Sequence, residues 1–144
     1  MPKPFYIACD FDGTIVDHRF PDIGQEAAGA CGWLRRWREA GASLILWTMR
    51  SDGRTGTGAD NGPVLADAVA FCKARGVEFF GVNENPTRTS WTGSPKVYAN
   101  VYVDDASIGC PLRESPRAGG RPVADWSAIG PTVLDLVERH FGGG

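Results

Sequence analysis

Long apolar runs are missing from the 144-residue sequence: no uninterrupted apolar segment reaches the ~20 residues that a membrane-spanning helix needs. The first four residues, Met-Pro-Lys-Pro, lead directly into a short apolar run and do not form the charged and apolar regions of a signal peptide. We therefore expect a protein without a membrane span, located in the cytoplasm.

An excess of charge of one sign is also missing. The chain has 15 basic and 17 acidic side chains, which gives a formal net charge of -2. This balance provides no general attraction to a polyanion or an acidic membrane, so it argues against nucleic-acid binding through bulk charge.

Closely spaced cysteines are absent as well. The four cysteines are Cys9, Cys31, Cys72 and Cys110. No pair has the spacing of a zinc site or a redox motif, so we expect reduced thiols.

The chain does contain enough apolar material for one core. Hydrophobic residues make up 42% of the sequence, and its length matches the ~100 to 150 residues of an ordinary folded unit. We expect residues 1–144 to form a single domain.

Four short apolar segments have the pattern of strands buried on both faces of a parallel sheet. Three of them, each ending in a polar residue, are residues 5–9, 43–48 and 100–104. Residues 77–82 are a weaker candidate because Glu78 and Gly81 interrupt the apolar run, which suits a position near the sheet edge.

Helices are predicted between these strands and after the last one. Residues 27–40 form one candidate that stops at Gly41, and residues 63–75 form another, with Pro63 at the first helical position. A third helix is expected to open at Pro131. Strands that alternate with helices predict an α/β fold with a doubly wound parallel sheet and right-handed crossovers. Three segments are predicted to be irregular: residues 13–25, 51–62 and 110–125.

Polar side chains follow the predicted strands at their carboxyl ends, which is where an open parallel sheet binds its ligand. Asp10, Thr48 and the pair Asp104-Asp105 each lie at or just after such an end. Lys96 follows a Ser-Pro pair, the pattern of a helix start, so we expect it on a short helix before the last strand. Folding should bring these residues to one edge of the sheet.

Four motifs therefore follow one another along the chain. They are Asp10-Phe11-Asp12-Gly13-Thr14, a hydrophobic strand ending in Thr48, Lys96, and Val103-Asp104-Asp105. In this order they resemble the signature motifs of the haloacid dehalogenase (HAD) superfamily, over residues 5 to about 109. The resemblance implies a Rossmann-like fold without a cap domain, since residues 13–25 and 82–95, where caps are inserted, are too short for a folded domain.

The same resemblance implies a phosphatase that works through an aspartyl-phosphate. Asp10 matches the family's nucleophile. Asp12 matches the general acid and base, which protonates the leaving oxygen and then activates water. Dehalogenase members lack that second acid, so its presence points to phosphoryl chemistry.

A magnesium ion is the expected cofactor. A carboxylate that attacks a dianionic phosphate must overcome like-charge repulsion, which a Mg²⁺ ion between the two groups reduces. The resemblance implies that the ion is bound by Asp10, by the backbone carbonyl of Asp12 and by the acidic pair. Within that pair Asp105 is our choice for the direct ligand, with Asp104 supporting it.

Four further residues are candidates for phosphate binding. Thr48 would offer a hydroxyl, and Lys96 would offset negative charge on the nucleophile and the phosphate. Gly13 would let the chain turn away close to the phosphate. Arg50 could reach a phosphate from the loop after Thr48, although an ordinary surface arginine is an equally good interpretation.

The expected function is hydrolysis of a phosphomonoester carried by a small molecule or a macromolecule. The alternatives are a receiver-like signalling module, a non-catalytic binding protein, and a phosphotransferase or phosphomutase. A receiver places its acidic pair after the first strand, whereas Asp104-Asp105 come last, and a binding protein would be marked by loss of Asp10 or Asp12. Phosphotransferases and phosphomutases share the first half-reaction and stay open.

The sequence specifies neither the substrate nor the oligomeric state. Asn83-Glu84-Asn85-Pro86 and Asp125-Trp126 also resemble segments of small bacterial and phage hydrolases, which names no substrate. His18 follows the nucleophile and is a candidate substrate contact. The glycine-rich residues 51–62 are predicted to be a mobile flap over or beside the phosphate site, or else a plain surface loop.

Overall fold

A four-stranded parallel sheet forms the centre of the computed structural model, which describes residues 2–142 apart from the side chain of Thr89. The strands are β1 (Tyr6–Cys9), β2 (Ser43–Leu46), β3 (Gly81–Val82) and β4 (Val101–Val103). Their order is β3-β2-β1-β4. Every residue of β1 is buried, as expected for a central strand covered on both faces. A strand forms within each of the four predicted segments, but of residues 77–82 only Gly81 and Val82 form β3, at the edge of the sheet.

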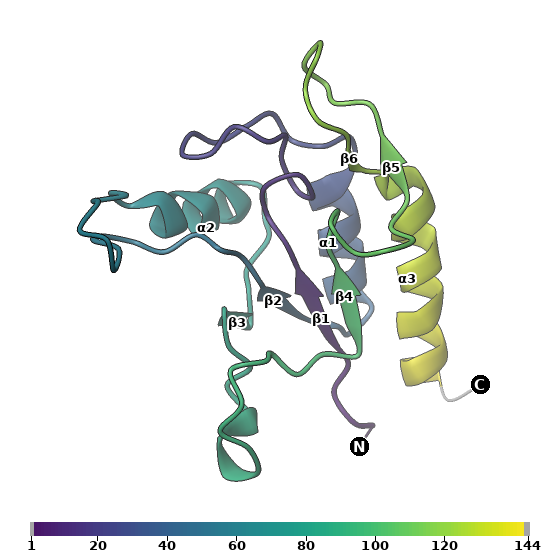
Figure 1. Cartoon of the computed structure of the whole chain (residues 1–144). Helices are drawn as coiled ribbons and strands as arrows, with labels where there is room; N and C mark the ends of the chain where they lie inside the picture. Colours follow the sequence, from purple (N-terminus) through teal and green to yellow (C-terminus); the bar gives the residue numbers. More distant parts are fainter. Residues whose placement is uncertain (1, 143–144) are drawn as a thin grey trace.

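Three helices pack against one face of this sheet (Figure 1). They are α1 (Ala30–Glu39), α2 (Val64–Ala74) and α3 (Trp126–Gly142). Their buried side chains form one hydrophobic cluster with Ile7 and Leu44 of the sheet. Within it the rings of Trp37 and Trp126 lie 5.2 Å apart, and the Trp37 indole nitrogen donates a hydrogen bond to the Gly130 carbonyl. The predicted α/β class with a parallel sheet is confirmed.

The other face of the sheet is covered by residues 83–100, which contain only the short 3-10 helix η1 (Arg88–Ser90). Tyr6, Ala8, Ile45 and Val97 form a smaller apolar cluster there. The prediction of a short helix at Lys96 is wrong, because residues 91–100 contain no helix. The Lys96 amide instead donates to the Ser94 hydroxyl at 3.2 Å. Too few residues separate Lys96 from β4 to repay helix nucleation.

The last helix also differs from its prediction. α3 begins at Trp126, and Pro131 lies inside it. The carboxylate of Asp125 accepts hydrogen bonds from the Ser127 amide and hydroxyl at 3.1 and 2.6 Å, so a capping acid marks the start of the helix. Residues 110–125, predicted to be irregular, contain an antiparallel pair, β5 (Leu112–Arg113) and β6 (Val123–Ala124).

Both described chain ends lie at the amino ends of the strands, away from the carboxyl ends of β1 and β4 (Figure 1). No helix within residues 2–142 combines the length and the apolar character needed to cross a membrane.

Candidate active site

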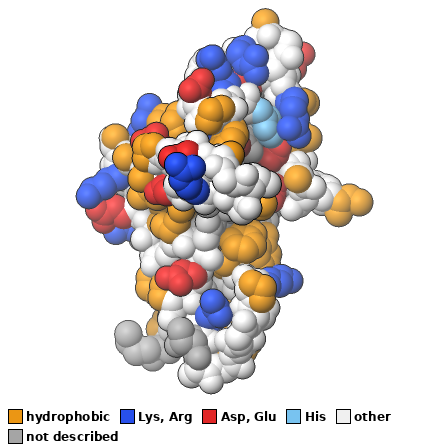
Figure 2. Space-filling view, turned by 60° about the vertical axis from the view of Figure 1, so that its left-hand side comes forward, with side chains coloured by type: hydrophobic (Ala, Val, Ile, Leu, Met, Phe, Trp, Pro, Cys, Tyr) orange, Lys and Arg blue, Asp and Glu red, His pale blue; other side chains and the backbone are white. Residues whose placement is uncertain are grey.

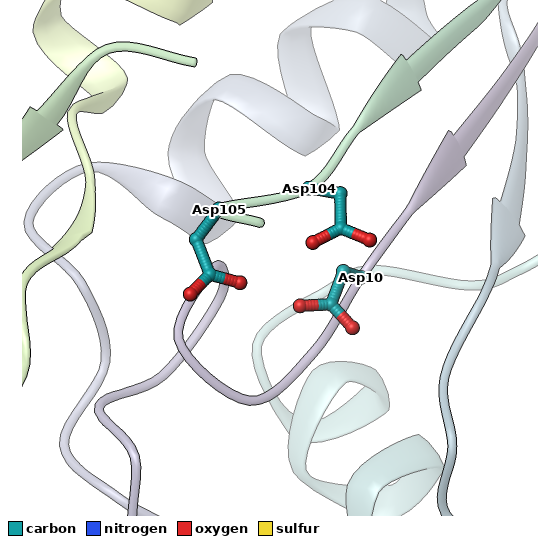
Figure 3. Close-up of side chains that lie close together, drawn as sticks. All are labelled: Asp10, Asp104 and Asp105. Carbon is teal, nitrogen blue, oxygen red and sulfur yellow. The ribbon is translucent and has the colours of Figure 1, made fainter. Parts of the chain in front are cut away.

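Three acidic side chains meet at the carboxyl ends of β1 and β4 (Figure 3). Asp10 follows β1, and Asp104 and Asp105 follow β4, which pairs with β1 in parallel. One carboxylate oxygen from each acid lies within 4.8 Å of the other two. From β1 the chain continues to β2 and β3 on one side and returns to β4 on the other, and ligands bind where the winding reverses in this way.

Thr14 connects the acids and is itself fully buried. Its hydroxyl lies 3.0 Å from Asp10 Oδ2 and 3.3 Å from Asp105 Oδ1, and it accepts a hydrogen bond from the Asp105 amide at 3.0 Å. A hydroxyl has one hydrogen, so it donates to one of the two carboxylates at a time. The sequence assigned no role to Thr14, although its position four residues after Asp10 in the first motif was the available signal.

The proton affinity of Asp10 reflects this crowding. Burial, then the negative charge of Asp104 and the hydrogen bond with Asp105, raise the pKa of Asp10 to about 8. The hydrogen bond from Thr14 acts in the opposite direction and only partly compensates. A carboxylate placed among like charges is stabilised by a proton or by a cation.

The donor set of this cluster fits a hard divalent cation. Carboxylate oxygens are the ligands that Mg²⁺ prefers, and one or two of them usually suffice because the ion keeps several waters. The candidate ligands are Asp10, Asp104 and Asp105. The side chain of Asp12 is not part of this group, so the predicted contribution of Asp12 would come from its backbone carbonyl alone.

Gly13 and His18 close the cluster on the side of the first loop. The imidazole Nε2 of His18 lies 3.0 Å from Asp105 Oδ2. Gly13 has a φ of +86°, and a Cβ atom at this position would collide with His18 and Asp105. The glycine is therefore required by backbone conformation and by space. His18, a candidate substrate contact from the sequence, contacts a candidate metal ligand.

Asp12 is held by Arg50, whose side chain is 1% exposed. Nε and Nη2 of Arg50 donate to the two carboxylate oxygens of Asp12 at 2.8 and 2.7 Å. The other N–H groups donate to the carbonyls of Pro21, Asp22 and Val64 at 3.3, 2.8 and 3.0 Å. All five N–H groups are thus engaged within the protein. This differs from both interpretations of Arg50 made from the sequence, because it is neither a surface residue nor free to bind a phosphate.

Thr48 follows β2, and Lys96 lies in residues 83–100, which cover the other face of the sheet. The Thr48 hydroxyl lies just after β2 and accepts a hydrogen bond from the Arg50 amide at 3.1 Å. Lys96 is exposed, with Nζ 5.6 Å from the centre of the Tyr102 ring, and lines a hollow that also includes Asp104. Within residues 2–142, Lys96 forms no ion pair.

A solved structure gives this arrangement a relative. A conserved protein coded by a locus of Bacteroides thetaiotaomicron is 32% identical to this chain, and the match covers 93% of each chain with a TM-score of 0.66. The chain belongs to the family of that conserved protein. No protein-family model and no curated protein matches the chain.

The segment predicted to be a flap, residues 51–62, does not cover the cluster of Asp10, Asp104 and Asp105. Residues 51–62 form a small hairpin, in which the Gly53 amide donates to the Gly62 carbonyl, the Asn61 amide donates to the Gly53 carbonyl, and the Thr55 amide donates to the Ala59 carbonyl. Figure 1 shows this hairpin projecting beyond the start of α2, away from the carboxyl ends of β1 and β4. Asp52 accepts hydrogen bonds from the first amides of α2, which ties the base of the hairpin to that helix.

A different segment, residues 110–122, contacts the loop that follows Asp10. The buried carboxylate of Asp17 accepts hydrogen bonds from Ser115 and Arg117 at 2.7 and 3.0 Å, and Arg117 also bonds the His18 carbonyl. Burial opposes ionisation of Asp17, but these hydrogen bonds outweigh it and lower its pKa. In the upper part of the view in Figure 2, basic side chains lie beside a histidine, and acidic side chains lie below them.

Proposed function

We propose that this protein is a magnesium-dependent phosphohydrolase of the haloacid dehalogenase type, which hydrolyses phosphomonoesters through an aspartyl-phosphate on Asp10. The observation that carries the proposal is the cluster of Asp10, Asp104 and Asp105 at the ends of two adjacent strands. The position of β1 between β2 and β4 supports the doubly wound arrangement expected of this fold.

The metal would be held by Asp10, Asp105 and the Asp12 carbonyl, with Asp104 beside them. The raised pKa of Asp10 supports this proposal, because a cation would relieve the repulsion that causes part of the shift. When bound, Mg²⁺ would supply positive charge between the attacking carboxylate and the phosphate dianion.

In the first half-reaction, an oxygen of Asp10 forms a bond to phosphorus while the bond to the leaving oxygen breaks. Asp12 supplies a proton to that leaving oxygen where one is required. Thr14 holds the Asp10 carboxylate in place through its hydroxyl. The covalent intermediate divides one difficult displacement into two easier steps.

In the second half-reaction, a water oxygen attacks the same phosphorus and Asp12 accepts a proton from that water. The bond between phosphorus and Asp10 breaks, and inorganic phosphate leaves. Thr48 would donate to a phosphoryl oxygen, and Lys96 would offset negative charge from its position beside Asp104.

Turnover of phenyl phosphate tests the proposal. We expect hydrolysis with Mg²⁺, loss of hydrolysis with a chelator, and loss of nearly all turnover in Asp10→Asn, which removes the nucleophile but keeps its shape. Asp135→Asn is the matched control, because Asp135 is an exposed residue paired with Arg139 on α3. Full activity in excess chelator, or wild-type rates for Asp10→Asn, would contradict the proposal.

A further inference from the structure

Residues 115–126 form a strap across the loop that follows β1, beyond the carboxyl ends of the strands (Figure 1). Three residues of the strap donate hydrogen bonds to backbone carbonyl groups of that loop. They are the Ala124 amide to Gly13 at 3.0 Å, the Trp126 indole to Thr14 at 2.8 Å, and Arg117 to His18 at 3.2 Å. The strap therefore holds the loop backbone at both ends of residues 13–18.

Asp17 joins the same loop to the strap through its side chain, which is fully buried. Its two carboxylate oxygens accept hydrogen bonds from the Ser115 hydroxyl at 2.7 Å and from Nε of Arg117 at 3.0 Å. A buried carboxylate needs such partners, so the position of the loop depends on the strap. Arg117 contacts both Asp17 and the carbonyl of His18, and this limits the positions open to the His18 ring.

The side chains of Thr14 and His18 extend from this loop to Asp105. The Thr14 hydroxyl lies 3.3 Å from Asp105 Oδ1, and Nε2 of His18 lies 3.0 Å from Asp105 Oδ2. Asp105 lies two residues beyond the end of β4, so the pairing of the strands does not by itself orient its carboxylate. Each carboxylate oxygen that accepts one hydrogen bond keeps a lone pair that can face a cation.

We infer that Arg117 and His18 are positioning residues, through which the strap holds the Asp105 carboxylate in the orientation that binds the metal ion. The inference rests on the proposed function for the presence of that ion. Hydrogen-bond partners of metal ligands orient those ligands, and their loss typically lowers metal affinity by ~10- to 100-fold. The property that the strap controls is therefore the Kd of the metal, before any substrate binds.

Arg117→Gln tests the strap, and Arg75→Gln is its matched control. Arg117 is 48% exposed and pairs with Asp17 at 3.0 Å, and Arg75 is 41% exposed and pairs with Glu26 at 3.2 Å. Loss of a positive charge would by itself tighten the binding of a cation, whereas loss of positioning weakens it. We expect the Kd for Mn²⁺ to rise roughly tenfold in Arg117→Gln, and to stay near the wild-type value in Arg75→Gln. An unchanged or lower Kd in folded Arg117→Gln would overturn the inference.

His18→Leu and His18→Gln test the contact with Asp105. Leucine removes the hydrogen bond, whereas the amide of glutamine can donate or accept one and does not titrate. We expect the Kd for Mn²⁺ to rise ~10- to 100-fold in His18→Leu and to recover most of the way in His18→Gln. Wild-type affinity in His18→Leu, or equal affinities in the two variants, would overturn the inference.

Electron paramagnetic resonance of free Mn²⁺, at fixed pH and without substrate, measures these affinities separately from turnover. Mn²⁺ is the probe because it takes the same oxygen ligands as Mg²⁺. A wild type that binds Mn²⁺ but does not hydrolyse phenyl phosphate would contradict the proposed function, while the variants would still decide the inference. A wild type that binds no Mn²⁺ would overturn both. If Arg117→Gln does not fold, the two His18 variants decide the question.

Discussion

Asp10→Asn should make the metal-free protein more stable at alkaline pH. The carboxyl group of Asp10 has its usual pKa of 3.8 in the unfolded chain and a pKa of about 8 in the folded protein. The folded protein therefore binds this proton more tightly, so the wild type loses stability as the pH rises from about 4 to about 8. Above that range the loss is complete, and asparagine at this position avoids it.

The size of the effect follows from the same shift. At ~1.4 kcal/mol for each pKa unit, the upper value is ~6 kcal/mol. Because Asp10 is only partly buried, solvent screens part of the repulsion, and we expect about 2 kcal/mol. For a chain of this length, that raises Tm by roughly 4 to 8 °C.

Thermal unfolding in chelator near pH 9 and near pH 5 measures this difference, which should shrink at the lower pH. Saturating Mg²⁺ should reverse the order, since a ligand at 100 times its Kd adds ~2.7 kcal/mol to the protein that binds it. Asp135→Asn, an exposed carboxylate on α3, should show neither effect. If Asp10→Asn is no more stable than the wild type near pH 9 without metal, the described crowding of the acids is wrong.

Three further variants test separate parts of the site. Gly13→Ala should lower stability by ~1 to 3 kcal/mol and remove turnover, because its Cβ would meet His18 and Asp105 at a positive φ; normal unfolding and activity would show that this turn has room. Asp17→Asn should cost ~1 to 3 kcal/mol in denaturant unfolding, since it weakens the buried contacts with residues 115–117, and a change below 0.5 kcal/mol would contradict those contacts. Lys96→Ala should reduce turnover with an unchanged Tm, because Lys96 is exposed, and an unchanged rate would return it to the role of a surface charge.

The features that depend on local pattern could be predicted from the sequence. Each strand of the parallel sheet is a short apolar run, and the carboxyl ends of neighbouring parallel strands meet at one edge. That rule alone brings Asp10 together with Asp104 and Asp105, although more than ninety residues separate them. The first two helices, α1 and α2, likewise followed from apolar periodicity and from the glycines that end them.

The features that depend on side-chain burial or on competing local signals could not be predicted in this way. Nothing in the sequence distinguishes Arg50 from a surface arginine, because its partners come from the first motif, the following loop and a helix start. Pro131 suggested a helix start, but the cap at Asp125 acts earlier in the chain. The glycines of residues 51–62 indicated mobility, whereas the backbone there closes on itself as a hairpin.

The most direct test of the central claim is mass spectrometry of the protein after acid quenching during turnover of an acyl or aryl phosphate with Mg²⁺. We predict a phosphoryl group on the peptide that contains Asp10, labile at alkaline pH as an acyl phosphate should be, and absent from Asp10→Asn. The adduct should accumulate further in Asp12→Asn, where water activation is impaired. Turnover without any adduct in Asp12→Asn, or a phosphoryl group on another residue, would contradict the account.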